Sequence, residues 1–353
     1  MRKTTMFAML LGTLTLAAIA VQAQSFLEVP RDSQHAEVKQ RIGLTDVTIN
    51  YSRPLVKGRK VWGSLVPYDK VWRAGANENT TISFSDAVTI EGKPLPAGTY
   101  GLHMIPGQDE WTVIFSRNST SWGSFTYDQN EDALRISVKP QPSDMHEALT
   151  YDFDGMKDDS AVVTLRWDKL AVPFKVDVDV SQVTQASFKK QLRAAPKYTW
   201  EGWYEASDYL LNKKLDLKDA LAYADESINQ EERFDTLMLK ARVLDAMGRG
   251  SDAAPIRDKA LAMGNALQLN SYGRTLQRDG KQDQAFEIFR LNGKRNPGHF
   301  IVHYEVARMS VAQGDFDNAL KEMKVALARS PDQFRPFLEG LLKRLEAKEN
   351  INP

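Results

Sequence analysis

The stretch VPFKVDVDV, residues 172–180, is the clearest guide to the fold class of the first half of the chain. Apolar residues occupy every second position, and the positions between them include Lys175, Asp177 and Asp179. Successive side chains of a β-strand point to opposite faces of the sheet. The pattern therefore predicts a strand with one buried and one solvated face.

The same alternation recurs from about residue 37 to residue 180. The alternating apolar sets are 47/49/51, 100/102/104, 111/113/115, 149/151/153 and 161/163/165/167. The turn signals EGK (91–93), PAG (96–98) and PGQD (106–109) separate some of them. We count roughly nine or ten short strands, each with one buried face. The interpretation is an antiparallel β-sandwich or jelly-roll-like domain over residues 28–181.

From about Ser187 onward the apolar period changes to 3.6, which indicates helices. Four alanines follow one another at intervals of 33, 32 and 34 residues: Ala220, Ala253, Ala285 and Ala319. The last three each have a glycine five residues earlier, namely Gly248, Gly280 and Gly314. This spacing is typical of tetratricopeptide (TPR) repeats. We expect a linker helix over 182–198 and TPR-like helices over 199–350; a generic helical bundle is the alternative.

The first 23 residues have the features of a secretory signal peptide. Arg2 and Lys3 give a basic start, residues 6–21 are mostly apolar, and Val21-Gln22-Ala23 fits the small-residue cleavage rule. An uncleaved membrane anchor is the alternative, but the apolar run is shorter than the ~20 residues that a span needs. The expected cut lies between Ala23 and Gln24, which predicts a periplasmic or secreted protein.

The composition excludes several classes of function. The chain of 353 residues has 46 basic and 46 acidic residues, so without the two basic residues of the signal its net charge is 44 − 46 = −2. Nucleic-acid binding would call for a basic face. The chain has no cysteine, which excludes disulfides, thiolate metal sites and cysteine nucleophiles.

The first half resembles the DUF2911 family, exported bacterial domains of unknown function. The resemblance covers about residues 51–176 and includes YSRP (51–54), KGR (57–59), VWRAGANE (71–78), PAGTYGL (96–102), EWTVIF (110–115) and VPF (172–174). It implies an exported β-domain, to which a C-terminal TPR segment is commonly attached. It implies no established activity.

Polar residues that lie among the aromatic positions are the candidate ligand-binding residues. They are Arg53, Arg59, Arg73, Asn77, Glu78 and His103. Arginine binds carboxylate or phosphate through paired hydrogen bonds, and a glutamate near a histidine acts as an acid–base pair. The alternative is structural: Arg73 and Glu78 pair with each other, and Gly75 supplies a positive φ for a turn.

We expect no metal and no cofactor. His299 and His303 are four residues apart, but two histidines make an incomplete metal site, so packing in the last repeat is the preferred interpretation. No phosphate loop, dinucleotide fingerprint or nucleophile elbow is present.

Two hypotheses of function remain. The first is a binding module of the cell envelope, with a peptide or envelope-protein partner in the repeats and a small-molecule or carbohydrate ligand on the β-domain. The second is a hydrolase-type enzyme that uses Glu78 and His103 with anion-binding arginines.

Overall fold

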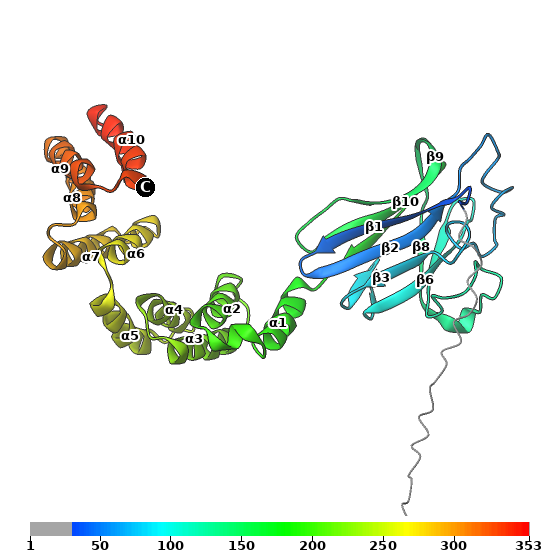
Figure 1. The fold of residues 1–353 in the computed structure, drawn as a ribbon, viewed down its shortest axis with the longest axis horizontal. Coiled ribbons are helices and arrows are strands. Elements are labelled where there is room, and N and C mark those ends of the chain that lie inside the picture. The colour runs from blue at the N-terminus through cyan, green and yellow to red at the C-terminus, as the bar shows by residue number, and fades with distance from the viewer. Residues whose placement is uncertain (1–29, 353) are drawn as a thin grey trace, which may run out of the picture. The chain divides into compact units, whose positions relative to one another are not determined.

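The computed structural model describes residues 30–352, and it divides between Val183 and Thr184 into two compact units, the β-unit and the helical unit. Figure 1 shows the strands of the first unit and the helices of the second. The expected signal peptide, residues 1–23, lies outside the described residues. Within residues 30–352 no helix is long and apolar enough to cross a membrane.

The β-unit is built from two antiparallel sheets. The six-stranded sheet has the order β1 (Gln34–Ile42), β2 (Thr45–Arg53), β3 (Thr81–Phe84), β6 (Gly98–Ile105), β7 (Trp111–Ser116) and β8 (Asp132–Val138). The four-stranded sheet has the order β5 (Lys93–Leu95), β4 (Val88–Ile90), β10 (Ser160–Asp177) and β9 (Gln141–Asp154). The predicted antiparallel β-domain is therefore confirmed.

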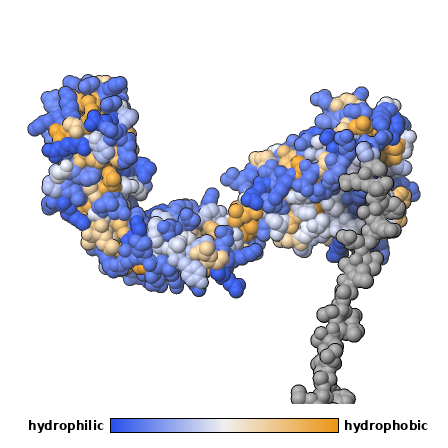
Figure 2. All heavy atoms as spheres, viewed as in Figure 1, coloured by the Kyte–Doolittle hydropathy of each residue, from blue (hydrophilic) through white to orange (hydrophobic). Residues whose placement is uncertain are grey.

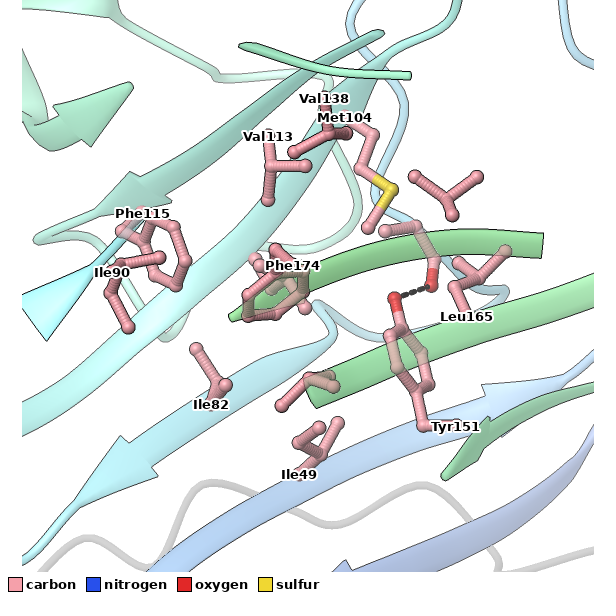
Figure 3. Close-up of a cluster of buried hydrophobic side chains, with 14 of the residues drawn as sticks. Ile49, Ile82, Ile90, Met104, Val113, Phe115, Val138, Tyr151, Leu165 and Phe174 are labelled. Carbon is pink, nitrogen blue, oxygen red and sulfur yellow. Dashed lines mark hydrogen bonds between the residues drawn. The ribbon is translucent and has the colours of Figure 1, made fainter. Parts of the chain in front are cut away.

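The core of the β-unit contains the alternating residues that the sequence pattern marks. Ile49, Val113 and Phe115 come from the six-stranded sheet, and Leu165 and Phe174 from the four-stranded one; all five are 0% exposed. Figure 3 shows these side chains gathered in one cluster. Each strand that packs against this cluster thus places its apolar positions on one face.

The strand β10 differs from the prediction. It is one strand of 18 residues, where the pattern suggested two short ones, and its register to β9 shifts on both sides of Asp168. The strand ends at Asp177, and Val180 already begins the helix α1 (Val180–Gln191). Val178 and Val180 still pack on the β-core, so the apolar spacing continues after the strand geometry has ended.

The helical unit contains pairs of antiparallel helices. After η2 (Ala195–Tyr198), the pairs are α2 (Trp200–Asn212) with α3 (Leu217–Gln230), α4 (Phe234–Ala246) with α5 (Gly250–Met263), α6 (Ala266–Arg278) with α7 (Gln282–Arg295), and α8 (Phe300–Ala312) with α9 (Phe316–Arg329). After η3 (Asp332–Phe334), the helix α10 (Arg335–Glu346) packs on α9. In the view of Figure 2, which is that of Figure 1, the surface over these helices is mostly hydrophilic.

The repeat spacing now has a physical explanation. The four repeat alanines lie in the second helix of each pair and are 0% exposed, so a larger side chain would separate the helices. Gly248, Gly280 and Gly314 have φ of 74°, 74° and 79° in the turns between paired helices, a conformation that glycine adopts most easily. In the α2–α3 turn, Lys214 takes this role with φ of 53°. The TPR-like prediction is confirmed.

Candidate functional site

The loop that leads into β3, residues 71–80, forms a tight corner, which we call the corner loop. Ala74 and Asn77 adopt φ of 49° and 57°, and Gly75 does not have a positive φ, so the expectation for Gly75 was wrong. A Cβ at position 75 would lie 2.5 Å from Thr80 Oγ1, so close packing explains this glycine. The buried Tyr151 hydroxyl donates a hydrogen bond of 2.9 Å to the Ala74 carbonyl and holds the corner in place.

The first two candidate arginines bond to their own surroundings. Arg53 Nε donates to the Leu149 carbonyl at 2.9 Å, and its Nη2 donates to Thr150 Oγ1 at 2.7 Å, which ties β2 to β9. Arg59 donates to the backbone carbonyls three and four residues before it. The geometry gives both a structural role, and neither lies with the corner loop at a common cavity.

The two charged candidates of the corner loop are not paired with each other. Arg73 donates to the Asn77 carbonyl, and its guanidinium carbon lies 5.5 Å from the Phe125 ring centre. Glu78 instead accepts a hydrogen bond from Arg31 in an exposed ion pair. The expected Arg73–Glu78 pair was therefore wrong.

His103 is buried, with 1% of its surface exposed, although it lies on the outer side of β6. Residues 117–128, which we call the covering loop, provide the contacts that bury it. His103 Nδ1 lies 3.0 Å from Ser124 Oγ, and its ring meets the Tyr127 ring edge-on at 5.5 Å. Burial lowers the His103 pKa to about 4, against an opposing effect of the Asp132 charge, so the imidazole is neutral at neutral pH.

The proposed acid–base pair of Glu78 and His103 is not assembled in this structure. Burial acts to raise the pKa of Glu78, but the hydrogen bond from Arg31 and the nearby charges outweigh it, so the pKa of Glu78 is lowered. Glu78 bonds to Arg31 and lines the cavity described below, whereas His103 bonds to Ser124 under the covering loop and does not line that cavity. The two side chains therefore have separate environments.

A cavity of about 490 Å³ lies where the corner loop meets β1 and β2. Of the six sequence candidates, only Asn77 and Glu78 line it; Arg31, His35, Asn50, Ser52 and Asn79 also do so. Asn79 is 8% exposed, and its Nδ2 donates to the Asn118 carbonyl at 3.2 Å. Its Oδ1 is buried without a hydrogen-bond partner among the described residues.

A second and larger cavity, of about 750 Å³, lies along α4 and α6 in the helical unit. We call it the repeat groove. Its apolar wall includes Phe234, Met238 and Leu276, and its charged residues are Arg242, Arg257, Lys281, Asp235, Asp245 and Asp279. Arg242 donates to Asp208 Oδ1 at 2.9 Å and remains exposed. The groove thus combines apolar contact area with charges of both signs.

The histidines of α8 have structural partners. His299 Nδ1 accepts a hydrogen bond from the Ile301 amide at the start of α8, and His303 Nδ1 lies 2.7 Å from Glu322 Oε2. Within residues 30–352, no group of three or more metal-ligating side chains is arranged to hold a metal ion.

Two buried polar clusters lie between the last two helix pairs. In the first, Glu305 is 0% exposed, and its Oε1 accepts hydrogen bonds from Asn270 at 3.0 Å and Asn292 at 2.8 Å. Its Oε2 has no partner among the described residues. Burial raises the pKa of Glu305 to about 8, and the two amide hydrogen bonds only partly oppose this. The second cluster is centred on Arg308, which is 1% exposed.

Comparison with solved structures finds TPR proteins over less than half of this chain. A structure titled "Crystal structure of YrrB: a TPR protein with an unusual peptide-binding site" is 19% identical, covers 46% of this chain and 87% of that chain, and has a TM-score of 0.27. A structure titled "Crystal structure of MamA" is 18% identical, covers 43% and 94%, and has a TM-score of 0.28. The repeat assignment rests on the helix pairs described above and not on these likenesses.

The sequence comparisons concern the β-unit. A search of curated proteins found no match to this chain. The family model described as "Protein of unknown function (DUF2911)" matches residues 33–176, which run from the beginning of β1 almost to the end of β10. The resemblance seen in the sequence motifs is thereby confirmed: over residues 33–176, which make up most of the β-unit, this chain matches the DUF2911 family model.

Proposed function

We propose that this protein is a binding module of the bacterial cell envelope whose helical repeats bind an extended segment of a partner protein. The observation that carries the proposal is the repeat groove. A volume of about 750 Å³ bordered by apolar residues and by charges of both signs suits a peptide with mixed side chains. Stacked helix pairs offer such a surface because the first helices of successive pairs line one side.

Peptide selection against the purified protein tests this proposal. Selected peptides should bind the Arg242→Ala variant at least tenfold more weakly, because Arg242 is an exposed charged group of the groove. The matched control is Arg290→Ala, which removes an exposed arginine from α7 outside the groove. If no peptide is enriched, or if both variants bind equally, the groove is not the binding site.

For the β-unit we propose a small, neutral, hydroxyl-rich ligand such as a carbohydrate in the 490 Å³ cavity. Asn77 and Asn79 contribute neutral amide groups to the lining of the cavity, and such groups form hydrogen bonds with ligand hydroxyls. Asn50 and Ser52 add neutral donors and acceptors, and Arg31 is already paired with Glu78. The candidate arginines that would attract an anion are bonded elsewhere, which favours a neutral ligand over an anionic one.

An array of neutral and acidic glycans tests the β-unit proposal. Neutral glycans should bind the protein and should not bind the Asn50→Val variant. Thr48→Val is the matched control, because Thr48 lies two residues away on the same face of β2 and does not line the cavity. Binding of acidic glycans alone, or binding that survives Asn50→Val, would contradict the proposal.

We also propose that the protein is exported. We propose that residues 1–23 are removed and that residues 28–181 and 199–350 act in the periplasm or outside the cell. Mass spectrometry of the protein from the native cell should find an N-terminus at Gln24. A chain that begins at residue 1 in the membrane fraction would contradict export with cleavage.

The separate environments of Glu78 and His103 give no support to the hydrolase alternative, so we do not propose it.

A further inference from the structure

Residues 350–352, Asn-Ile-Asn, bind to the first helices of the last two repeats. The Ile351 carbonyl accepts a hydrogen bond of 2.8 Å from Arg308 Nη1. The Asn352 side chain donates to the Arg308 carbonyl at 3.0 Å and accepts from Gln277 Nε2 at 3.1 Å. The Ile351 side chain is 4% exposed and belongs to the apolar cluster of α8–α10. The segment is thus held by backbone, amide and apolar contacts together, and the Asn352 amide closes a turn onto Asn350 Oδ1 at 2.9 Å.

These contacts are made from the same position of the repeat that lines the repeat groove in α4. Arg242, Arg274 and Arg308 follow one another at intervals of 32 and 34 residues. The same intervals separate Ala253, Ala285 and Ala319, so the three arginines occupy one repeat position in α4, α6 and α8. Arg242 lines the repeat groove. Residues 350–352 therefore lie on the side of α8 that corresponds to the groove side of α4.

The groups around residues 350–352 retain hydrogen-bonding capacity. Arg308 Nε donates to Gln277 Oε1 at 3.0 Å, and its Nη1 also donates to the Tyr304 hydroxyl at 3.0 Å. Its Nη2 is buried and has no partner among the described residues. A guanidinium with a free N–H next to a bound carbonyl suits an extended peptide, which presents carbonyl groups along its length.

We propose that the first-helix side of the last two repeats is a peptide-binding site and that residues 350–352 occupy it as a self-ligand. The peptide class is an aliphatic residue flanked by amide side chains, with its carbonyl bound to Arg308. A partner segment of this class must displace the self-ligand before it binds. The inference rests on the proposed peptide-binding function of the repeats and adds its regulation.

If residues 350–352 occupy the site, they should compete with a free peptide, and the loss of peptide affinity can be estimated. A segment tethered to its own site has an effective concentration on the order of 1 mM. A free peptide with a Kd near ~0.1 mM would therefore bind the intact chain about tenfold more weakly than a chain whose self-ligand is removed.

Fluorescence anisotropy with a labelled synthetic peptide of residues 349–353 tests the proposal. We compare the intact chain, a chain that stops after Lys348, and the Ile351→Asp variant of the full chain. The peptide should bind the latter two about tenfold more tightly than the intact chain. A peptide with the Ile351→Asp change should not bind. Lys343→Asp is the matched control, since it places aspartate on the exposed face of α10 and should bind as the intact chain does.

Several outcomes would overturn the proposal that residues 350–352 act as a self-ligand. The shortened chain and the Ile351→Asp variant could remain helical and fail to bind the peptide, or bind it no better than the intact chain. Loss of the helical circular dichroism signal in both would make residues 350–352 a structural part of the fold. None of these outcomes touches the Arg242-dependent binding of selected peptides, so the proposed groove function is judged separately.

Discussion

Replacing Glu305 by glutamine should make the helical unit more stable at neutral and alkaline pH. Glu305 is fully buried with a pKa raised to about 8, whereas an exposed glutamate has a pKa of 4.5. Between these two values the folded state holds a proton that the unfolded chain releases. The stability of the folded state therefore falls as the pH rises from 4.5 to 8.

The size of the effect follows from the pKa difference. Each pH unit in this window costs about 1.4 kcal/mol, so stability falls by about 4 kcal/mol between pH 5 and pH 8. The glutamine side chain of the variant has no titrating proton, and its carbonyl oxygen still accepts from Asn270 and Asn292. Between pH 5 and pH 8 the stability of the wild type should therefore fall by about 4 kcal/mol relative to that of the variant, which does not titrate at this position.

Urea unfolding followed by circular dichroism at 222 nm, at four pH values from 5 to 8, measures this difference. The control is Glu287→Gln on α7, which changes an exposed glutamate and should leave the pH dependence unchanged. Parallel pH profiles for the wild type and Glu305→Gln would refute the reasoning. That result would mean that the carboxyl group is already ionised or solvated in the folded state.

Three further predictions concern other residues. The His103 ring signals should not titrate between pH 5 and 8 in NMR spectra, because its pKa is lowered to about 4, and a midpoint above 6 would contradict this burial. Gly273→Ala should cost about 1–3 kcal/mol in urea unfolding because its Cβ would lie 2.3 Å from a ring carbon of the facing phenylalanine. Gly340→Ala, with nothing within 4 Å, should gain about 0.5–1 kcal/mol, and equal effects would refute the packing argument. Tyr151→Phe should cost the β-unit about 1–2 kcal/mol through the lost hydrogen bond to the corner loop, whereas the exposed Tyr198→Phe should change nothing measurable.

The regular elements could be predicted because their signals are local. Alternation along a strand follows from backbone geometry, and the glycines of the helix turns mark a left-handed φ within the repeat. The prediction failed near Val180, where the apolar spacing served burial against the β-core and the backbone had already become helical. Spacing reports which side chains are buried, and it does not fix where a strand ends.

The candidate site could be predicted only in part because its partners are distant in the sequence. Asn77 donates to a carbonyl 44 residues away, and Arg53 donates to groups 96 and 97 residues away. No local pattern tells whether an arginine will meet a ligand or a backbone carbonyl. His103 stands between the apolar positions 102 and 104, so the alternation alone would place it on a solvated face, but residues of the covering loop, 117–128, bury it.

The junction between the pair α4–α5 and the pair α6–α7 has a consequence for how the helical unit unfolds. The backbones of these two pairs approach each other less closely than those of the neighbouring pairs do. In a linear array of repeats, cooperativity depends on the interface between each repeat and the next. We expect this sparse backbone contact to let the blocks α2–α5 and α6–α10 melt in successive steps, although Phe234 and Met238 of α4 share an apolar cluster with Leu269 of α6. The protonation of Glu305 would then shift the melting step of the second block and leave that of the first unchanged.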